Sequence, residues 1–236
     1  MIDAHALTKR YGTVDVLRGL DLHVARGQVT AIVGPNGAGK TTFIKSVLGL
    51  TRPDSGTLTF DGVPVSDDDA YRARIGYMPQ IARFPDHMTG HDLLGLLRDL
   101  RGGAAVPERL AASLGLESDL GKKLRVLSGG TRQKVNAVAA FLFSPELYVL
   151  DEPTAGLDPV SSVVLKDRIR TERDNGATVL LTSHIMSDID ELADVVVYLV
   201  DGRVQYQGAL PDFKHAMGQS SLERAIAEMM SRRVAA

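Results

Sequence analysis

The stretch GPNGAGKTT, residues 34–42, decides the fold of this chain. It follows an apolar run, VTAIV at 29–33, and precedes TTFIKSVLGL, whose apolar residues recur at helical spacing. Strand, glycine-rich loop and helix in this order predict a phosphate-binding loop, in which backbone N–H groups turn toward phosphate oxygens. Lys40 can reach the β- and γ-phosphates, and Thr41 can offer its hydroxyl to Mg²⁺. The nucleotide-binding residues predicted here are Gly34, Pro35, Asn36, Gly37, Ala38, Gly39, Lys40, Thr41 and Thr42.

Two further apolar runs, at 147–151 and 177–183, are typical of parallel strands that helices cover on both faces. The first run ends in Asp151 and is followed by Glu152. Asp151 is placed to hold Mg²⁺ through water, and the Glu152 carboxylate can orient and polarise an attacking water. The second run leads to His184, at the strand end where α/β sheets bind ligands, so its imidazole can donate to the γ-phosphate. A structural role for this lone histidine is the alternative.

A second anion site is predicted at LSGGTRQK, residues 127–134, because a hydroxyl and two glycines open onto a helix N-terminus. A chain that holds Mg-ATP in the first site has no use for a second phosphate site of its own. Two copies packed head to tail would each present Ser128, Gly129 and Gly130 to the nucleotide of the neighbour. ATP binding would then close the dimer, and hydrolysis would reopen it.

Composition excludes several function classes. The 236 residues carry a formal net charge of −2, so no nucleic-acid partner is expected. The absence of cysteine excludes disulfides, thiolate metal sites and cysteine nucleophiles. There is no run of 18 consecutive apolar residues, so a membrane span would have to come from another chain.

In combination, these motifs resemble the nucleotide-binding domain of ATP-binding cassette (ABC) transporters over roughly residues 2–210. The resemblance implies an α/β fold with a RecA-like P-loop NTPase core, an antiparallel β lobe and an inserted helical lobe. It implies that Tyr11 stacks on adenine and that Gln80, in YMPQ, links the γ-phosphate and Mg²⁺ to the helical lobe. Asp158, in AGLD, matches the loop that crosses the dimer, and His184 matches the switch histidine.

The same resemblance implies an ATPase that drives transport, with ATP and Mg²⁺ as cofactors. Its partners would be a transmembrane permease subunit, a second copy of the chain and accessory proteins of the transporter. It would lie in the cytoplasm, peripheral on the inner face of the cell membrane. Catalysis is assigned to Glu152, His184, Gln80 and Lys40, and Mg²⁺ binding to Thr41, Gln80 and Asp151.

The signature departs from the family pattern at one position. Its fifth residue is often glutamine, but here it is Thr131, with Gln133 two residues further on. The first four residues carry the phosphate chemistry, so function is expected to survive. The polar contacts of Thr131 are left open by the sequence.

The domain boundaries expected are 1–80 with 128–213 for the core and β lobe, 81–127 for the helical lobe, and 214–236 for a C-terminal helical tail. The apolar residues of the tail recur at i, i+3, i+4 and i+7, which predicts a helix packed on the body. In the helical lobe, the family resemblance implies a groove for a short helix of the membrane partner. Phe84, Pro85 and Met88 are candidate contacts there, and ordinary packing residues are the alternative.

Three other functions compete with the transporter. A soluble ABC ATPase of the cluster-assembly type is also a single cassette. A non-hydrolysing regulatory module would not need Glu152 or His184. A GTPase or small-molecule kinase would have no use for LSGG, and the chain lacks an N-K-x-D motif.

Among transporters, the chain is similar to the ATPases of ABC-2 type exporters, which share GPNGAGKTT, DEPTAGLDP and the short C-terminus. More narrowly, YMPQIARFPDHMT with LSGGTRQKV resembles the cassette subunit of the nitrous-oxide reductase maturation transporter, which supports copper-site assembly.

Overall fold

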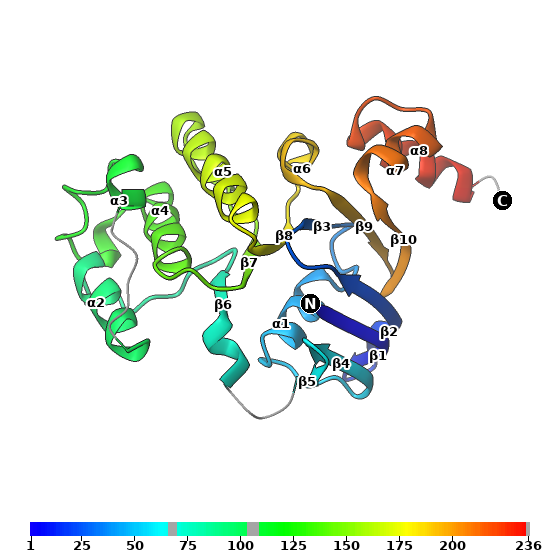
Figure 1. Ribbon diagram of the computed structural model, residues 1–236, viewed down its shortest axis with the longest axis horizontal. Coiled ribbons are helices and arrows are strands. Elements are labelled where there is room, and N and C mark those ends of the chain that lie inside the picture. Colours follow the sequence, from blue (N-terminus) through cyan, green and yellow to red (C-terminus); the bar gives the residue numbers. More distant parts are fainter. Residues whose placement is uncertain (66–69, 103–108, 235–236) are drawn as a thin grey trace.

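The computed structural model describes residues 1–65, 70–102 and 109–234, the side chains of 232–234 excepted. Its strands form two sheets, which share an apolar cluster around helix α1 (Lys40–Val47) (Figure 1). One sheet belongs to the nucleotide-binding core and the other to an antiparallel lobe, so the α/β architecture expected from the sequence is present.

The central sheet has six strands, and all but one edge strand run parallel. The predicted strands 29–33 and 147–151 are confirmed residue for residue, because both runs are buried along their whole length. The strands are, in spatial order, β10 (Arg203–Ala209), β9 (Val195–Val200), β3 (Val29–Val33), β8 (Thr178–Thr182), β7 (Leu147–Asp151) and β6 (Ile75–Met78).

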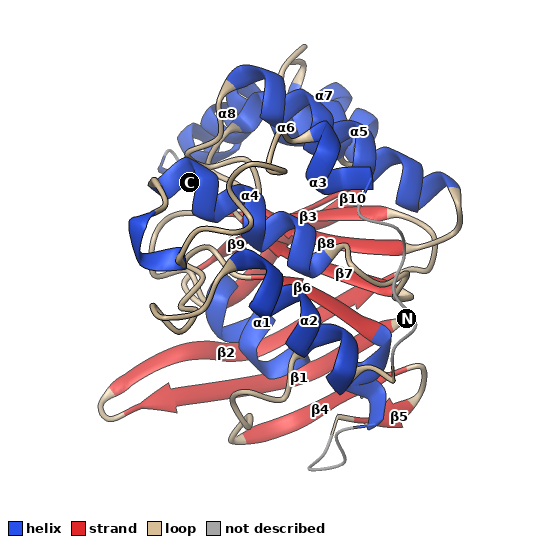
Figure 2. Cartoon of the chain, turned by 90° about the vertical axis from the view of Figure 1, so that its left-hand side faces the viewer, coloured by secondary structure: helices blue, strands red, loops and turns tan. Residues whose placement is uncertain are grey.

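The second sheet is antiparallel and contains the N-terminus of the chain (Figure 2). Its strands alternate between buried and exposed residues over much of their length, as expected for a sheet with one face on the core. In spatial order they are β2 (Val14–Val24), β1 (Ile2–Tyr11), β4 (Ser55–Phe60) and β5 (Val63–Pro64).

The helices divide into a lobe and a layer. The helical lobe contains α2 (Gly90–Leu100), α3 (Arg109–Ser113) and the short 3₁₀ helix η2 (Leu124–Val126); another 3₁₀ helix, η1 (Ala70–Arg74), precedes β6. Apolar residues recur at helical spacing in the stretch PERLAASLGL, residues 107–116, and the structure has a helix there from Arg109; the first two residues of the stretch lie outside the described ranges. The layer contains α4 (Gly129–Ala140), α5 (Pro159–Asp174), α6 (Met186–Leu192), α7 (Leu210–Met217) and α8 (Leu222–Val234).

The central sheet separates two apolar clusters. Alternate residues of β7 point to opposite faces, so Tyr148 and Leu150 join the cluster under α4–α8, whereas Leu147 and Val149 join the cluster around α1. The predicted packing of the C-terminal helix is confirmed, since Leu222 and Ala225 are fully buried and Ile226 and Met229 pack against the same cluster. Helix α7, at Leu210–Met217, directly precedes α8 in the C-terminal segment.

Within the described part of the chain, no helix combines the length and the apolar character needed to cross a membrane.

Candidate nucleotide site

The carboxyl ends of four parallel strands meet at one edge of the central sheet, where ligands of α/β folds bind. The phosphate-binding loop follows β3, Gln80 follows β6, Asp151 ends β7, and His184 comes after β8. Together they line a cleft of about 670 Å³. The cleft is lined by Val14, Val16, Asn36, Gly37, Ala38, Gly39, Lys40, Thr41, Thr42, Gln80, Asp151, Glu152 and His184.

The loop glycines are required by close backbone approach. A Cβ on Gly34 would lie 2.0 Å from the carbonyl oxygen of Leu199, and Gly34 has φ 153°. Gly39, at φ 109°, directly precedes α1, and a Cβ there would meet Leu17 and the carbonyl of Val16 at about 3 Å. The N-terminus of α1 therefore faces the cleft from a tightly packed turn, an arrangement that suits a phosphate group.

Lys40 places a buried ammonium group inside the loop. Its Nζ donates to the carbonyl oxygens of Gly34 at 2.7 Å and Pro35 at 3.1 Å. Burial lowers the pKa of the Lys40 ammonium, and the carboxylates of Glu152 and Asp151 oppose that shift. The ammonium thus faces both carboxylates across the cleft.

The two acidic residues of the cleft are held by different partners. The hydroxyl of Thr182 donates to Asp151 Oδ1 at 2.5 Å. Glu152 Oε2 accepts from the backbone N–H of His184 at 3.0 Å, and Oε1 lies 3.3 Å from Nε2 of the same residue. Glu152 is 4% exposed and has a left-handed backbone, with φ 54°. The acid and the histidine predicted from separate strand ends are therefore in direct contact.

Thr41 and Asp151 offer a hydroxyl and a carboxylate to the same cleft, which suits a hard cation such as Mg²⁺. Among residues 1–65, 70–102 and 109–234, no three His, Asp or Glu side chains gather into a metal site. That sparse donor set fits Mg²⁺, which keeps several waters and binds through few carboxylates together with substrate phosphates.

Tyr11 lies beside the cleft rather than in its wall. It ends β1, is 47% exposed, and is the cross-strand partner of Val14, which does line the cleft. Its hydroxyl lies 3.3 Å from that of Thr51. Val14 and Val16 are the cleft residues that the sequence analysis missed, and only the long hairpin of β1 and β2 brings them over the loop.

The signature residues lie outside this cleft. Ser128 is exposed and caps α4 by accepting from the backbone N–H of Thr131 at 3.1 Å. The Thr131 hydroxyl lies 2.8 Å from that of Ser128, which answers the open question about its polar contacts. A Cβ on Gly130 would lie 2.9 Å from the carbonyl of Gly156, so the signature packs closely on the segment after Glu152.

Asp158 also lies outside the cleft. It caps α5 by accepting from the backbone N–H of Ser161 at 2.9 Å, and its carboxylate is 2.9 Å from Lys134 Nζ on α4. The Ser161 N–H and then the Lys134 ammonium hold the pKa of Asp158 well below its usual range. The carboxylate therefore joins the start of α5 to the signature helix.

Comparison with known proteins agrees with this geometry. Residues 17–155 match the family model described as ABC transporter. The daunorubicin/doxorubicin resistance ATP-binding protein DrrA of Streptomyces peucetius is 37% identical over 98% of this chain and 72% of its own length. The Nod factor export ATP-binding protein I of Burkholderia orbicola (strain AU 1054) is 36% identical over 94% of this chain and 73% of its own length.

A solved structure, described as the ATP-binding subunit of an ABC transporter, superposes with a TM-score of 0.90 at 32% identity. It covers 98% of this chain, and this chain covers 99% of it. The chain belongs to the ABC transporter family, as the ATP-binding and ATP-hydrolysing subunit. ATP is its substrate and Mg²⁺ its metal cofactor.

Proposed function

We propose that Glu152 is the general base of ATP hydrolysis, with His184, Gln80 and Lys40 as its catalytic partners. The observation that carries this proposal is the convergence of these four residues on one cleft. The Glu152 carboxylate is buried, and the His184 backbone N–H fixes one of its oxygens, so it can accept a proton from a water positioned at the other. Bound Mg²⁺ supplies charge neutralisation at the phosphates, and Asp151, Thr41 and Gln80 are the residues to hold it.

The nucleotide is held by the loop and by the hairpin above it. The backbone N–H groups from Asn36 to Thr42 and the Lys40 ammonium bind the phosphates. The adenine ring stacks on Tyr11, with Val14 and Val16 as apolar neighbours. The exposure of Tyr11 and Val14 supports this assignment, because both present free apolar surface beside the cleft.

We infer a head-to-tail homodimer in which Ser128, Gly129 and Gly130 contact the nucleotide of the other subunit. These residues are solvent-accessible and do not line their own cleft. Large apolar side chains are exposed close to Asp158 and His184: Val160 is 73% exposed, Val163 53% and Ile185 41%. A dimer that covers these side chains and the signature accounts for their exposure.

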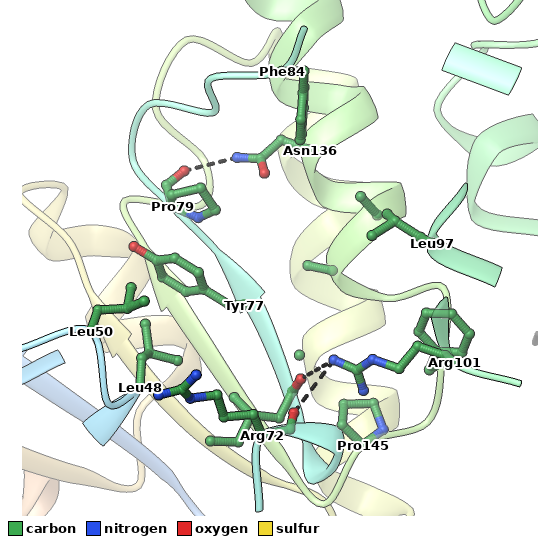
Figure 3. Close-up of a pocket in the computed structure, with 15 residues that line it drawn as sticks. Leu48, Leu50, Arg72, Tyr77, Pro79, Phe84, Leu97, Arg101, Asn136 and Pro145 are labelled. Atoms are coloured by element: carbon green, nitrogen blue, oxygen red, sulfur yellow. Dashed lines mark hydrogen bonds between the residues drawn. The ribbon is translucent and has the colours of Figure 1, made fainter. Parts of the chain in front are cut away.

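The membrane partner is expected to dock in an apolar groove of about 370 Å³ between the helical lobe and the core (Figure 3). Figure 3 shows Leu48, Leu50, Tyr77 and Phe84 around it, with Arg72 and Arg101 at one end. These apolar walls suit the apolar face of a short helix, which binds by laying that face into such a groove. Of the three contacts expected from the sequence, Phe84 lines the groove, Met88 is partly buried against the same apolar cluster as Phe84, and Pro85 is exposed.

The relatives favour export. One relative is a daunorubicin/doxorubicin resistance ATP-binding protein and the other a Nod factor export ATP-binding protein, and export is the direction proposed for this chain. A subunit of this kind would lie in the cytoplasm, peripheral on the inner face of the cell membrane. The domain boundaries at residues 80, 127 and 213, a role in copper-site assembly and the involvement of accessory proteins stay predictions.

The test is purification of the tagged chain from its native membranes in mild detergent, with mass spectrometry of what accompanies it. Two matched variants sharpen it: Leu50→Asp, in the groove and 61% exposed, and Val63→Asp, on β5 and 66% exposed. Wild type and Val63→Asp should retain a polytopic membrane protein at near-equal abundance, and Leu50→Asp should lose it. Recovery of soluble partners alone would favour the cluster-assembly alternative.

A further inference from the structure

Two amide side chains lie together on the buried face of α4. Gln133 is 8% exposed and Asn136, one turn further on, is 1% exposed. The Asn136 amide nitrogen, Nδ2, donates to Gln133 Oε1 at 3.3 Å. Buried amides need partners for all their N–H groups, so the remaining contacts of this pair show what it connects.

On one side, the pair holds the chain at the end of β6. Asn136 Nδ2 also donates to the carbonyl oxygen of Pro79 at 2.8 Å, the hydrogen bond drawn in Figure 3. Pro79 is the residue before Gln80, which lines the nucleotide cleft. Asn136 and Pro79 also both line the apolar groove.

On the other side, the pair holds the backbone that follows β7. Gln133 Nε2 donates to the carbonyl oxygens of Glu152 at 3.3 Å and Pro153 at 3.2 Å. Glu152 has a positive φ of 54°, which is strained for a residue with a side chain, and such strain persists only where the surroundings enforce it. The Glu152 N–H is held by the carbonyl of Thr182 at 3.1 Å, and its carbonyl accepts from Ala155 at 3.2 Å as well as from Gln133.

We propose that Gln133 and Asn136 are positioning residues that hold Glu152 in its left-handed conformation and couple it to the Gln80 segment. Neither residue lines the nucleotide cleft, so both act through others. The two amides make four donor contacts, one for each of their N–H groups, and turning either amide over would set oxygen against a carbonyl oxygen. These hydrogen bonds form a relay that runs from Pro79 through Asn136 and Gln133 to Glu152 and Pro153. The relay therefore has one arrangement, and it joins two segments of the cleft that follow separate strands.

The relay also gives the groove a physical route to the catalytic carboxylate, a consequence that rests on the docking proposed above. A helix seated in the groove would press on Pro79 and Asn136, and Gln133 would transmit the displacement to the Glu152 carbonyl. The tests of the relay use the chain without a membrane partner. A failure of the docking proposal would leave their results unchanged.

The primary variant is Gln133→Met, which keeps the length of the side chain and removes both donors. The nearly isosteric Asn136→Leu removes the donors at the other end without burying a charge, and it serves as the second variant. Gln205→Met is the matched control, because it makes the same change at a partly exposed glutamine of β10 that lines neither the cleft nor the groove. The measurements are kcat and KM for ATP, the thermal midpoint, and hydrogen exchange at two backbone amides. The Ala155 N–H donates to the Glu152 carbonyl, and the His184 N–H donates to the Glu152 carboxylate.

Gln133→Met and Asn136→Leu should each lower kcat at least tenfold and leave KM within about threefold, while exchange at the backbone amides of Ala155 and His184 becomes faster. Gln205→Met should match the wild type. The double variant should lose less than the product of the two single losses, because either change breaks the same relay. Folded variants with kcat within twofold of wild type would overturn the proposal. Variants in which kcat, KM and thermal midpoint deteriorate together would also overturn it, since that pattern shows general damage to packing.

Discussion

The buried carboxylate of Asp188 accepts a hydrogen bond of 2.6 Å from the hydroxyl of Thr154, 34 residues away in the chain. Thr154 follows Glu152 on the segment that leads to Asp158, and Asp188 lies on α6, one turn after His184. Lys166 Nζ, on α5, lies 3.4 Å from the same carboxylate. One carboxylate thus ties together the segments that carry Glu152, His184 and Asp158.

Thr154→Val tests this connection, because it keeps the shape of the side chain and removes the donor. A buried carboxylate that loses a partner costs about 1–3 kcal/mol in the free energy of unfolding, measured by urea denaturation. Thr171→Val, at an exposed position of α5, is the control and should change stability by less than about 0.5 kcal/mol. Equal stabilities for the two variants would show that the Thr154 hydrogen bond contributes nothing measurable.

Glu152→Gln tests the general base. The amide keeps the size of the side chain but cannot take the proton, so turnover should fall by about 10²–10⁴-fold. ATP binding should persist, and an ATP-bound dimer should accumulate because the step that opens it is blocked. Phosphate release and light scattering measure the two effects. Full activity in this variant would show that Glu152 is not the general base.

Lys40→Ala tests the phosphate-binding loop. Loss of charge-assisted hydrogen bonds to phosphate, worth about 1.5–3 kcal/mol, should weaken ATP binding by roughly 10–100-fold in calorimetry. Lys45→Ala is the matched control, because Lys45 lies on the same helix and is exposed away from the cleft. An unchanged affinity in Lys40→Ala would argue against the loop as the site of the phosphates.

Ser128→Arg separates the two phosphate sites. The long cationic side chain stands at the exposed N-terminus of α4, where it would obstruct the neighbour's nucleotide without reaching its own cleft. ATP binding by the monomer should match wild type, and the ATP-dependent increase in mass by light scattering should disappear. Normal dimer formation in this variant would refute the role proposed for the signature.

Local signals in the sequence were enough to predict the sheet and most of the cleft. The runs at 29–33 and 147–151 are continuous and apolar because helices cover both faces of their strands, and Asp201-Gly202 supplies the turn between β9 and β10. Cleft residues that directly follow a strand could be placed at the sheet edge without coordinates. Those that reach the cleft from the other sheet, Val14 and Val16, carry no such signal.

The contacts of the signature helix could not be predicted for the same reason. Gln133 was noted in the sequence only as a neighbour of Thr131, yet it bonds to Glu152, 19 residues away, and Asn136 bonds to Pro79, 57 residues away. Such contacts depend on how α4 packs against the segments that follow β6 and β7, and no periodicity along the chain encodes that packing. The Thr131–Ser128 contact, by contrast, follows from ordinary helix-capping chemistry.

The acid sensitivity of the fold should depend on Glu146, which precedes β7 and contacts Arg74 at 2.6 Å and Arg26 at 3.1 Å. The Arg74 guanidinium, with a smaller contribution from Arg26, lowers the pKa of Glu146 from 4.5 to about 2. A carboxyl whose pKa is lower in the folded state stabilises the fold above its unfolded pKa. That contribution is lost as pH falls from about 4.5 to about 2. Glu146→Gln cannot titrate, so the wild type should have the higher urea midpoint at pH 7. The difference between the two midpoints should narrow steadily below pH 4.5. The side chain is 46% exposed, so solvent screening keeps the gap small. A gap that stays constant across this pH range would show that the two arginines do not stabilise the ionised carboxylate.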